Sequence, residues 1–182
     1  MPLTSAEIAA FTGVDEARVR KEVEHGLFGT TSPPRFEEPA LVYFGTLKLL
    51  DIDLGPKDRE KLYGAIRSKV SAKHRSPETL KLGEVLEVRV GKVVRNLRHL
   101  VRDFTSWKKR LVVDDDILGG EPSFPRTRLS VRHIGQLLER GGADEVSEDY
   151  PDLSKKDLEY ARLFAAAYPR RGRPLERREA RP

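Results

Sequence analysis

Apolar and polar positions in the first third of the chain recur with helical spacing, interrupted by short turn-forming runs. The run Thr4-Ser5-Ala6-Glu7 has the residue pattern of a capping box and predicts the start of a short helix. Gly13 predicts a left-handed helix end, and Asp15 predicts the cap of a second helix that runs to about residue 25. A short helix, a glycine turn and a second helix make a helix-turn-helix arrangement.

The second helix has an apolar side and a charged side. Val14, Val19 and Val23 fall on one side and are expected to be buried. The charged residues expected to lie largely outside are Arg18, Arg20, Lys21 and Glu22. Residues 30–34, which are rich in Thr, Ser and Pro, predict a loop or a hairpin tip after this helix.

Two longer helices follow in the apolar pattern. Pro39 fits the first turn of one helix, and Gly55-Pro56 ends it. Its apolar residues predict a core element, with the members Leu41, Val42, Phe44, Leu47, Leu49 and Leu50. Residues 57–68 predict a second amphipathic helix.

The middle of the chain changes from strand to helical periodicity. Leu86, Val88 and Val90 alternate with charged residues and predict a half-buried strand. Apolar residues then recur at helical spacing over residues 93–104, and residues 108–113 predict a second short strand. The opposite face of the helix is basic, with Lys92, Arg95, Arg98, His99 and Arg102. We expect the apolar strand and the apolar side of this helix to form a homodimer interface.

The last third predicts three helices and a tail. Residues 131–140, residues 143–150 and a helix capped by Ser154 are separated by Gly and Pro turns, an arrangement that again resembles a helix-turn-helix unit. The tail, residues 169–182, holds six Arg, three Pro and one Leu. It has too little apolar surface to offset the loss of chain entropy on folding, so we expect it to be disordered in isolation.

The net charge of +5 is unevenly distributed. Residues 1–66 carry −3, residues 67–110 carry +9, residues 111–168 carry −5 and the tail carries +4. Separate charged regions favour separate surfaces for different partners. A basic middle suits phosphate groups, whose neutralisation releases counterions, and an ordinary solvated surface is an equal alternative.

Several classes of protein are disfavoured. No stretch approaches the roughly 18–20 apolar residues of a membrane-spanning helix, the N-terminus shows no secretory signal, and there is no cysteine, so we expect a cytoplasmic protein. The four histidines lack the spacing of a metal site, and no nucleophile or phosphate-loop motif is present, so we expect no enzyme and no cofactor. Asp114-Asp115-Asp116 predicts a solvated loop rather than a magnesium site, because adjacent residues of an extended chain point to alternate sides.

Residues 4–50 resemble the winged helix-turn-helix of MerR-type regulators. The resemblance rests on the turn Thr12-Gly13-Val14, the helix that follows it, Gly26-Leu27, and the pair Arg35-Phe36 at the end of the expected wing. It implies that Arg18, Arg20 and Lys21 lie near the major groove of DNA and that Arg35 contacts a flanking phosphate. The chain departs from these regulators in the acidic residues of its second helix and in lacking an effector-binding coiled coil. A helical module that docks proteins is the alternative interpretation.

Residues 114–168 resemble the DUF433 family. The resemblance rests on spaced segments in the same order, namely Gly119-Gly120-Glu121-Pro122, Thr127-Arg128-Leu129-Ser130-Val131, Tyr150-Pro151 with Leu153, and Asp157 with Ala161. Where the family has glycine before the Thr-Arg pair this chain has Arg126, and since only glycine enters positive φ without steric cost, this turn is expected to differ in shape. Thr127 and Arg128 are expected to act structurally, by capping or through a salt bridge to Asp149 or Asp157, more than by direct partner contact.

These resemblances imply a function. The DUF433 family is associated with type II toxin–antitoxin operons, as the antitoxin beside a PIN-domain-like ribonuclease toxin, and a MerR-like head before such a segment resembles antitoxins of VapBC-type pairs. Such a chain binds its toxin and the operator DNA of its own operon, and a two-fold operator favours a homodimer. Two alternatives stay open: a stand-alone helix-turn-helix transcription regulator, and a protein-interaction module without DNA binding.

The basic tail has three candidate uses. Its arginines could fill the carboxylate pocket that the resemblance implies for the toxin, with Arg170, Arg171, Arg173, Arg177 and Arg178 as toxin-binding residues. The tail could instead be a phosphate-binding arm or a solubilising end.

Patterns and resemblances together predict a mainly α protein with minor β. The expected parts are a MerR-like winged helix-turn-helix over residues 1–68, a basic α/β connecting and dimerisation segment over 69–113, a three-helix DUF433 domain over 114–168, and the Arg-rich tail.

Overall fold

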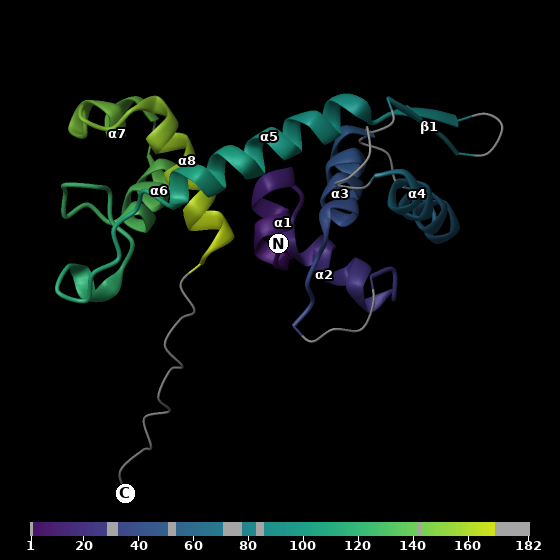
Figure 1. Cartoon of the computed structure of the whole chain (residues 1–182), viewed down its shortest axis with the longest axis horizontal. Helices are drawn as coiled ribbons and strands as arrows, with labels where there is room; N and C mark the ends of the chain where they lie inside the picture. Colours follow the sequence, from purple (N-terminus) through teal and green to yellow (C-terminus); the bar gives the residue numbers. More distant parts are fainter. Residues whose placement is uncertain are drawn as a thin grey trace, which may run out of the picture.

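The computed structural model describes residues 2–28, 33–50, 54–70, 78–82, 86–141 and 143–169. These residues form eight α-helices, one short 3-10 helix and one two-stranded antiparallel sheet (Figure 1). The prediction of a mainly α protein with minor β is therefore confirmed.

Two short helices with defined caps open the chain. In α1 (Ser5–Thr12) the Glu7 amide donates to the Thr4 hydroxyl at 3.2 Å, and the Thr4 amide donates to the Glu7 carboxylate at 2.8 Å. Gly13 ends α1 with a left-handed φ of 69°. Asp15 caps α2 (Glu16–Glu24) by accepting a hydrogen bond from the Ala17 amide at 2.7 Å. The predicted helix-turn-helix arrangement, including both caps, is confirmed as local structure.

The next two helices bury most of the aromatic residues of this half. α3 (Glu38–Leu50) starts just after Phe36, whose backbone pairs with Leu3, and α4 (Pro56–Lys69) packs against α3. Phe28 lies within 4.7–5.7 Å, centroid to centroid, of four other rings, those of Phe36, Tyr43, Phe44 and Tyr63. Gly55-Pro56 starts α4, as its turn-forming pattern suggests, with Pro56 in the first turn.

One expected core residue of α3 is on the surface. Leu49 is 61% exposed, whereas Leu47 is buried. The two residues are about 200° apart around the helix axis, so they cannot both face the core. The prediction of Leu49 as a core residue was wrong because Leu49 lies on the side of α3 that faces away from the core.

A hairpin and a long helix occupy the middle of the chain. β1 (Thr79–Leu82) pairs antiparallel with β2 (Leu86–Arg89), and α5 (Gly91–Lys108) follows. β2 and α5 were predicted, whereas β1 was missed because it is stabilised by pairing with β2 and packing against α4, which no local pattern contains. The strand predicted over residues 108–113 is absent from the described residues. Only Val112 in that stretch pairs, with Ser123, because a turn follows α5.

The last third forms three helices. They are α6 (Val131–Arg140), α7 (Ala143–Asp149) and α8 (Lys155–Ala167), and a 3-10 turn, η1 (Leu118–Gly120), precedes them. Ser154 and Asp157 form the capping box of α8. α6 and α8 cross at Gly135, where an added Cβ atom would lie 2.2 Å from the Ala161 carbonyl oxygen.

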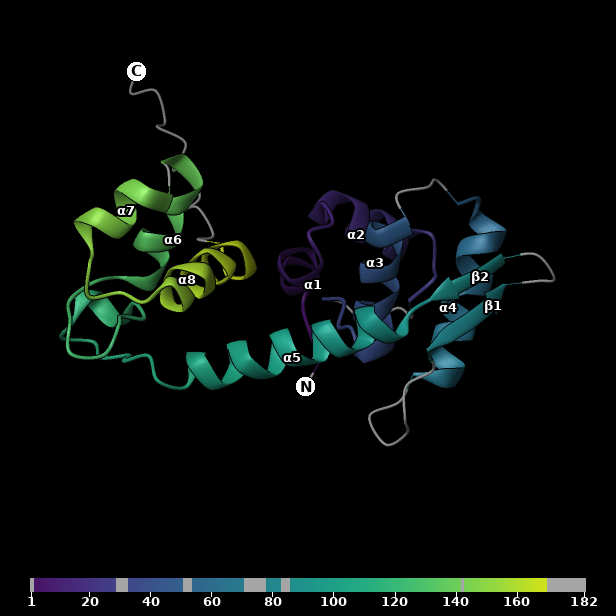
Figure 2. The same cartoon turned by 90° about the horizontal axis from the view of Figure 1, so that it is seen from above.

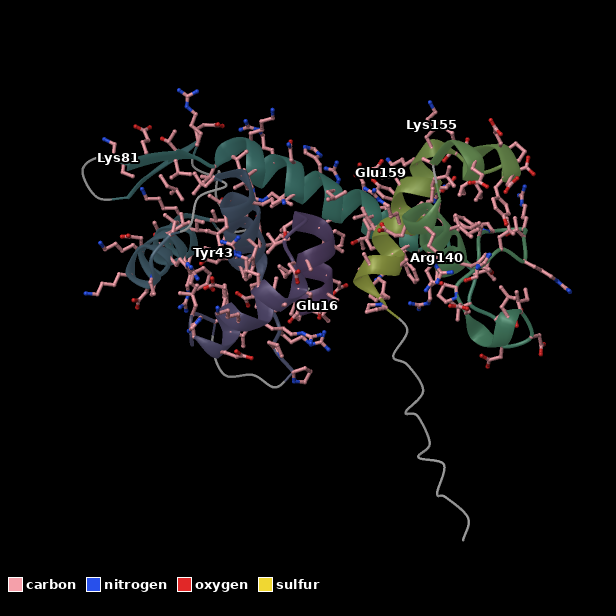
Figure 3. All side chains as sticks on the ribbon, turned by 180° about the vertical axis from the view of Figure 1, so that it is seen from behind. Glu16, Tyr43, Lys81, Arg140, Lys155 and Glu159 are labelled. Carbon is pink, nitrogen blue, oxygen red and sulfur yellow. The ribbon has the colours of Figure 1, made fainter. Side chains whose placement is uncertain are left out.

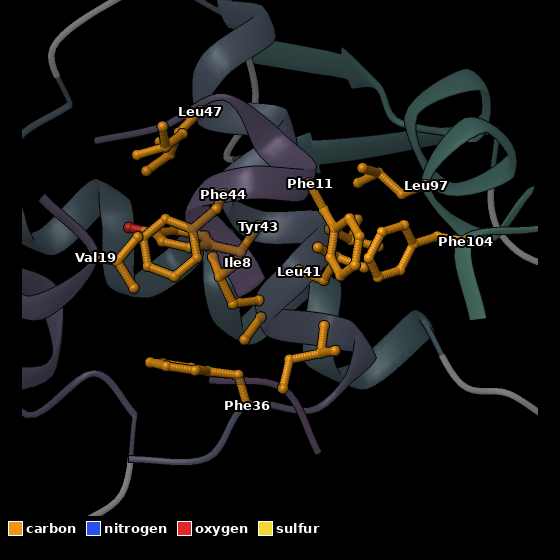
Figure 4. Packing of buried hydrophobic residues seen from close by; sticks show 14 of the residues in the cluster. Ile8, Phe11, Val19, Phe36, Leu41, Tyr43, Phe44, Leu47, Leu97 and Phe104 are labelled. Carbon is orange, nitrogen blue, oxygen red and sulfur yellow. The ribbon is translucent and has the colours of Figure 1, made fainter. Parts of the chain in front are cut away.

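α5 connects the two ends of the molecule. It runs from the hairpin and α4 at one end to α6 and α8 at the other (Figure 2). α1 packs against both α5 and α8, with the Phe11 and Phe104 rings in edge-to-face contact at 5.3 Å (Figure 4). The buried apolar residues consequently form one continuous cluster from Leu3 to Phe164.

The apolar sides of β2 and α5 are covered within the chain. Val88, Val94, Leu97 and Phe104 are at most 8% exposed. Leu97 packs so closely on α3 that a Cβ atom on Gly45 would lie 2.7 Å from it. The face predicted to form a homodimer interface is therefore the face that joins α5 to α1 and α3, and a homodimer has to use another surface.

Candidate nucleic-acid interface

The three cations predicted on α2 do not share one face. Arg20 is exposed, and its guanidinium donates to the Glu16 carboxylate at 2.6 Å. Glu16 lies at the start of α2, on the side of the molecule away from α5 (Figure 3). Arg18 is half-buried and lies about 200° around the axis from Arg20. Lys21 is exposed and sits three residues after Arg18, which makes these two neighbours on the helix surface.

Arg35 is exposed and stands on a separate element. It directly precedes Phe36, which is buried and whose amide donates to the Leu3 carbonyl at 2.8 Å. The backbone at Arg35 is therefore held beside α1 and α3. Of the loop or hairpin tip predicted over residues 30–34, residues 30–32 lie outside the described residues.

Glu22 is the residue of α2 that the sequence misassigned. It was expected to lie outside, but it is 3% exposed. Its carboxylate accepts a hydrogen bond from Arg59 of α4 at 2.8 Å and lies 3.5 Å from the Tyr43 hydroxyl of α3. Glu22 follows Val19 by three residues, so it shares the buried side of α2. The ion pair fixes α2 to both α3 and α4.

Tyr43 reports the electrostatics of this contact. Burial, and then the negative charge of Glu22, raise the pKa of its hydroxyl well above the ordinary value. Arg59 and Arg18 act in the opposite direction.

The charges of α2 cancel. The helix carries three basic residues, Arg18, Arg20 and Lys21, and three acidic residues, Glu16, Glu22 and Glu24. General electrostatic attraction to DNA is therefore weak at this helix. Any DNA contact by α2 depends on hydrogen bonds from Arg18 and Lys21 to base edges or nearby phosphates.

The predicted toxin-binding arginines, Arg170, Arg171, Arg173, Arg177 and Arg178, lie outside the described residues. The segment just before them is well anchored. The Tyr168 hydroxyl donates to Glu7 at 2.6 Å and accepts from the Lys108 ammonium at 2.8 Å. The described residues therefore end, at Pro169, beside the junction of α1, α5 and α8.

Thr127 acts structurally, as predicted, by closing a turn. Its hydroxyl donates to the Phe124 carbonyl at 3.0 Å and accepts from the Leu129 amide at 3.1 Å. Arg126, just before it, has a φ of 61°, so the chain keeps a left-handed turn without glycine. Arg128 is exposed and forms no ion pair with the described residues, so the salt bridge predicted to Asp149 or Asp157 is absent.

Asp157 is instead bound by other residues. It accepts hydrogen bonds from the Trp107 indole at 2.8 Å and from the Arg110 guanidinium at 3.3 Å, besides its capping contacts with Ser154. Burial acts to raise the pKa of Asp157, but the hydrogen bonds from Ser154 and Trp107 and the charge of Arg110 outweigh it and hold the pKa below the ordinary value. Asp157 thereby ties α8 to the end of α5.

A surface cavity of about 610 Å³ lies beside this contact. Its apolar lining includes Trp107, Phe124 and Tyr150, and charged groups of both signs surround it, among them Arg126 and Asp149. A lining that mixes aromatic rings with charged groups is suited to a polypeptide segment of a partner.

The structure offers no metal-binding group among the residues it describes. Asp114, Asp115 and Asp116 are all exposed, and no set of three or more potential ligands is grouped in the described ranges. The Asp114 carboxylate accepts from the Asp116 amide at 3.0 Å, which is a local loop contact.

Fold and surface together define a mainly helical protein in which a helix-turn-helix arrangement is joined by one long helix to a three-helix C-terminal unit. Residues 111–165, which make up most of that unit, match the family model described as "Protein of unknown function (DUF433)", in agreement with the resemblance predicted from the sequence motifs. Comparisons with curated proteins and with solved structures gave no match. No helix in the described ranges has both the length and the apolar character needed to cross a membrane.

Proposed function

We propose that this chain is the antitoxin of a type II toxin–antitoxin pair, acting in the cytoplasm. Its C-terminal part and tail neutralise a PIN-domain-like ribonuclease toxin, and its N-terminal part, a MerR-like winged helix-turn-helix, binds operator DNA as a homodimer and represses the operon. The two activities belong to the two ends of one connected molecule.

One observation carries the proposal. The helix-turn-helix arrangement packs directly on the segment that matches the DUF433 model, through α1 against α8, and the Tyr168–Glu7 hydrogen bond of 2.6 Å just after that segment adds to the contact. A partner bound at the C-terminal unit therefore contacts a body that also holds α2. Such a connection suits a repressor whose DNA affinity changes when its toxin is bound.

DNA binding is tested with the promoter of the operon as a labelled duplex. Because Arg18 and Lys21 are neighbours on α2, Arg18→Ala and Lys21→Ala should each weaken promoter binding by about 1–3 kcal/mol when the side chain contacts a base. Arg20→Ala should cost less, since Arg20 lies on a different face of α2 from Arg18 and Lys21. Arg35→Ala should weaken binding to all DNA sequences by a similar amount. It should also reduce the slope of log affinity against log salt concentration by about one, since one phosphate contact is lost.

Arg140→Ala is the matched control, because Arg140 is exposed at the end of α6, in the C-terminal unit and away from α2 (Figure 3). If the Arg18→Ala, Lys21→Ala and Arg20→Ala variants all bind the promoter with the affinity of the wild-type protein, sequence recognition by α2 is refuted.

Toxin neutralisation is tested by co-expression with the product of the neighbouring reading frame. The two proteins should co-purify, and this chain should restore growth of cells that produce the toxin. Truncation after Tyr168 removes the arginines at positions 170–181 and should abolish neutralisation while promoter binding persists. A truncated protein that still rescues growth would assign neutralisation to the helical unit.

The charge balance of α2 favours a second candidate function. A helix with as many acidic as basic residues also suits a module that binds proteins and not DNA. In that case the promoter assay shows no specific binding, but co-purification with the neighbouring product still succeeds. Specific promoter binding without any co-purifying partner would instead identify a stand-alone regulator. Light scattering with and without promoter DNA tests the homodimer.

A further inference from the structure

The outer side of α5 carries a row of basic residues that runs along most of its length, four of them Lys or Arg and one a histidine. The exposed residues Lys92, Arg95, His99, Arg102 and Lys109 follow one another at intervals of three, four, three and seven residues, which places them on one face. We call this row the α5 stripe. Ser106 is the exposed residue between the last two members, so the stripe contains no apolar and no acidic side chain.

α5 is far more basic than α2. It carries five Lys or Arg residues and a single acidic residue, Asp103, whereas the charges of α2 cancel. The stripe is also accessible, since the side chains of Arg95 and Arg102 are 56% and 65% exposed. A helix of 18 residues is about 27 Å long, enough to lie along several successive phosphates of a duplex.

The acidic groups near the stripe do not neutralise it. Glu78 pairs with Arg95 but is itself 70% exposed, and such a surface pair is weak and easily exchanged for another anion. Asp103 is shared between Arg102 at 3.2 Å and Lys156 at 3.7 Å, so two cations face one carboxylate. Lys92 and Lys109 form no ion pair with the described residues.

The stripe and α2 lie on different sides of the molecule. α1 and α3 stand between α2 and α5 in both perpendicular views (Figures 1 and 2). A straight duplex that contacts α2 therefore cannot also lie along the stripe. Whatever binds the stripe occupies a separate site.

We infer that the α5 stripe binds the phosphate backbone of a nucleic-acid duplex, without regard to sequence and independently of α2. The apolar side of α5 is buried against α1 and α3, so the helix has no apolar face to insert into a lipid surface. The stripe also lacks the aromatic or aliphatic anchors on which protein interfaces depend. The four exposed Lys and Arg side chains of this row can each contact a phosphate of a regularly repeating backbone.

The experiment compares two variants of the full chain with the same net charge. In the stripe variant, Lys92→Gln, Arg102→Gln and Lys109→Gln are combined. In the control variant, Lys57→Gln, Lys61→Gln and Lys69→Gln remove three exposed cations from α4. Because every position is exposed, circular dichroism and thermal unfolding should be unchanged in both. Binding is measured by fluorescence anisotropy with a short DNA duplex of arbitrary sequence, and with an RNA duplex of the same sequence, over a range of salt concentrations.

The wild-type and control proteins should bind the DNA duplex with a steep dependence of affinity on salt. The stripe variant should bind more weakly at low salt, and the slope of log affinity against log salt should fall by about 0.9 for each phosphate that the variant no longer neutralises. Similar behaviour with the RNA duplex identifies the phosphodiester backbone, rather than a feature of one helix form, as the ligand.

Equal affinities and slopes for the stripe and control variants, or no binding by the wild-type protein at low salt, would overturn the inference. The outcome is separable from that of the proposed function. Arg18→Ala with Lys21→Ala should leave binding to the arbitrary duplex intact, whether or not α2 recognises the promoter.

Discussion

The Tyr168 hydroxyl donates a hydrogen bond of 2.6 Å to the Glu7 carboxylate, across 161 positions of the sequence. Glu7 is 5% exposed, and its second oxygen accepts from the Thr4 amide to complete the cap of α1. Lys108 donates to the same tyrosine oxygen at 2.8 Å. One carboxylate thus caps the first helix and ties it to the last, next to the point where the basic tail begins.

Tyr168→Phe should destabilise the chain by about 1–3 kcal/mol. The substitution keeps the ring but removes the donor to a buried carboxylate oxygen, and an unsatisfied buried charged group is costly. Urea unfolding followed by circular dichroism measures the change in the free energy of unfolding.

Tyr150→Phe is the matched control. Tyr150 is half-buried in the same C-terminal unit, and its hydroxyl makes no hydrogen bond with the described residues. Its substitution should change the free energy of unfolding by less than about 0.5 kcal/mol. Equal effects of the two substitutions would mean that the Glu7 contact contributes nothing to stability.

Local signals in the sequence predicted the parts of the fold that depend on neighbouring residues. The caps at Thr4, Asp15 and Ser154 were found because each cap involves residues only two or three positions apart. The Tyr168–Glu7 contact depends on how α8 packs against α1, and no local pattern contains that information. The four-residue strand β1 was missed for a related reason, since its stability comes from pairing with β2 and packing against α4.

The candidate site was predicted only in part. The exposure of Arg20, Lys21 and Arg35 follows from helical periodicity and loop composition. The burial of Glu22 does not, because a carboxylate is buried only where a cation from elsewhere in the chain meets it, here Arg59. The spacing of Glu22 from Val19 was the one available signal.

Glu22→Ala should cost about 3 kcal/mol of stability. It leaves Arg59, whose side chain is 21% exposed, without its buried partner, and removing one member of a buried pair is strongly destabilising. Arg59 keeps its hydrogen bond to the Leu54 carbonyl, which holds the cost at the lower end of the usual range. Glu24→Ala, at an exposed position of the same helix, should change stability by less than about 0.5 kcal/mol in the same denaturation experiment. Similar losses for both variants would contradict the structural role of the Glu22–Arg59 pair.

Stability should fall as pH rises above about 10. Burial and the neighbouring carboxylates Glu22 and Glu7 raise the pKa of Tyr43 and of Tyr168 above the ordinary value of 10.0. In the unfolded chain both hydroxyls ionise near pH 10, while the folded chain keeps them protonated, so their contribution is complete below pH 10 and is lost at higher pH.

Each of these tyrosines can contribute a slope of up to about 1.4 kcal/mol per pH unit above pH 10. Denaturation at a series of pH values should show a shallower decline for Tyr43→Phe and for Tyr168→Phe than for the wild-type protein. An identical slope in all three proteins would mean that these groups do not titrate differently on folding.

The crossing of α6 and α8 should be intolerant of a single methyl group. A Cβ atom at Gly135 would lie 2.2 Å from the Ala161 carbonyl oxygen and 2.7 Å from the Ala165 Cβ atom, so Gly135→Ala should force the helices apart at a cost of about 1–3 kcal/mol. Gly64→Ala is the control, because Gly64 lies in α4 with nothing within 4 Å of the added atom. That substitution should stabilise the protein by about 0.5–1 kcal/mol, since alanine favours helix over glycine. The melting temperature should fall in Gly135→Ala and rise in Gly64→Ala. A higher melting temperature for Gly135→Ala than for the wild-type protein would contradict the close packing of α6 on α8.

Replacing Arg126 by glycine should relieve the backbone strain of the left-handed turn before Thr127. Arg126 has a φ of 61°, a conformation that costs a residue with a Cβ atom about 1–2 kcal/mol. Glycine adopts it freely but loses more entropy on folding, so Arg126→Gly should raise the free energy of unfolding by a net amount of about 0.5–1 kcal/mol. Arg128→Gly makes the same replacement two residues later, at an exposed position whose φ is not positive, and should lower stability slightly. The measurement is the melting temperature of both variants and of the wild-type protein. If Arg126→Gly lowers the melting temperature as Arg128→Gly does, the contacts of the Arg126 side chain stabilise the protein by more than the strain of its backbone destabilises it.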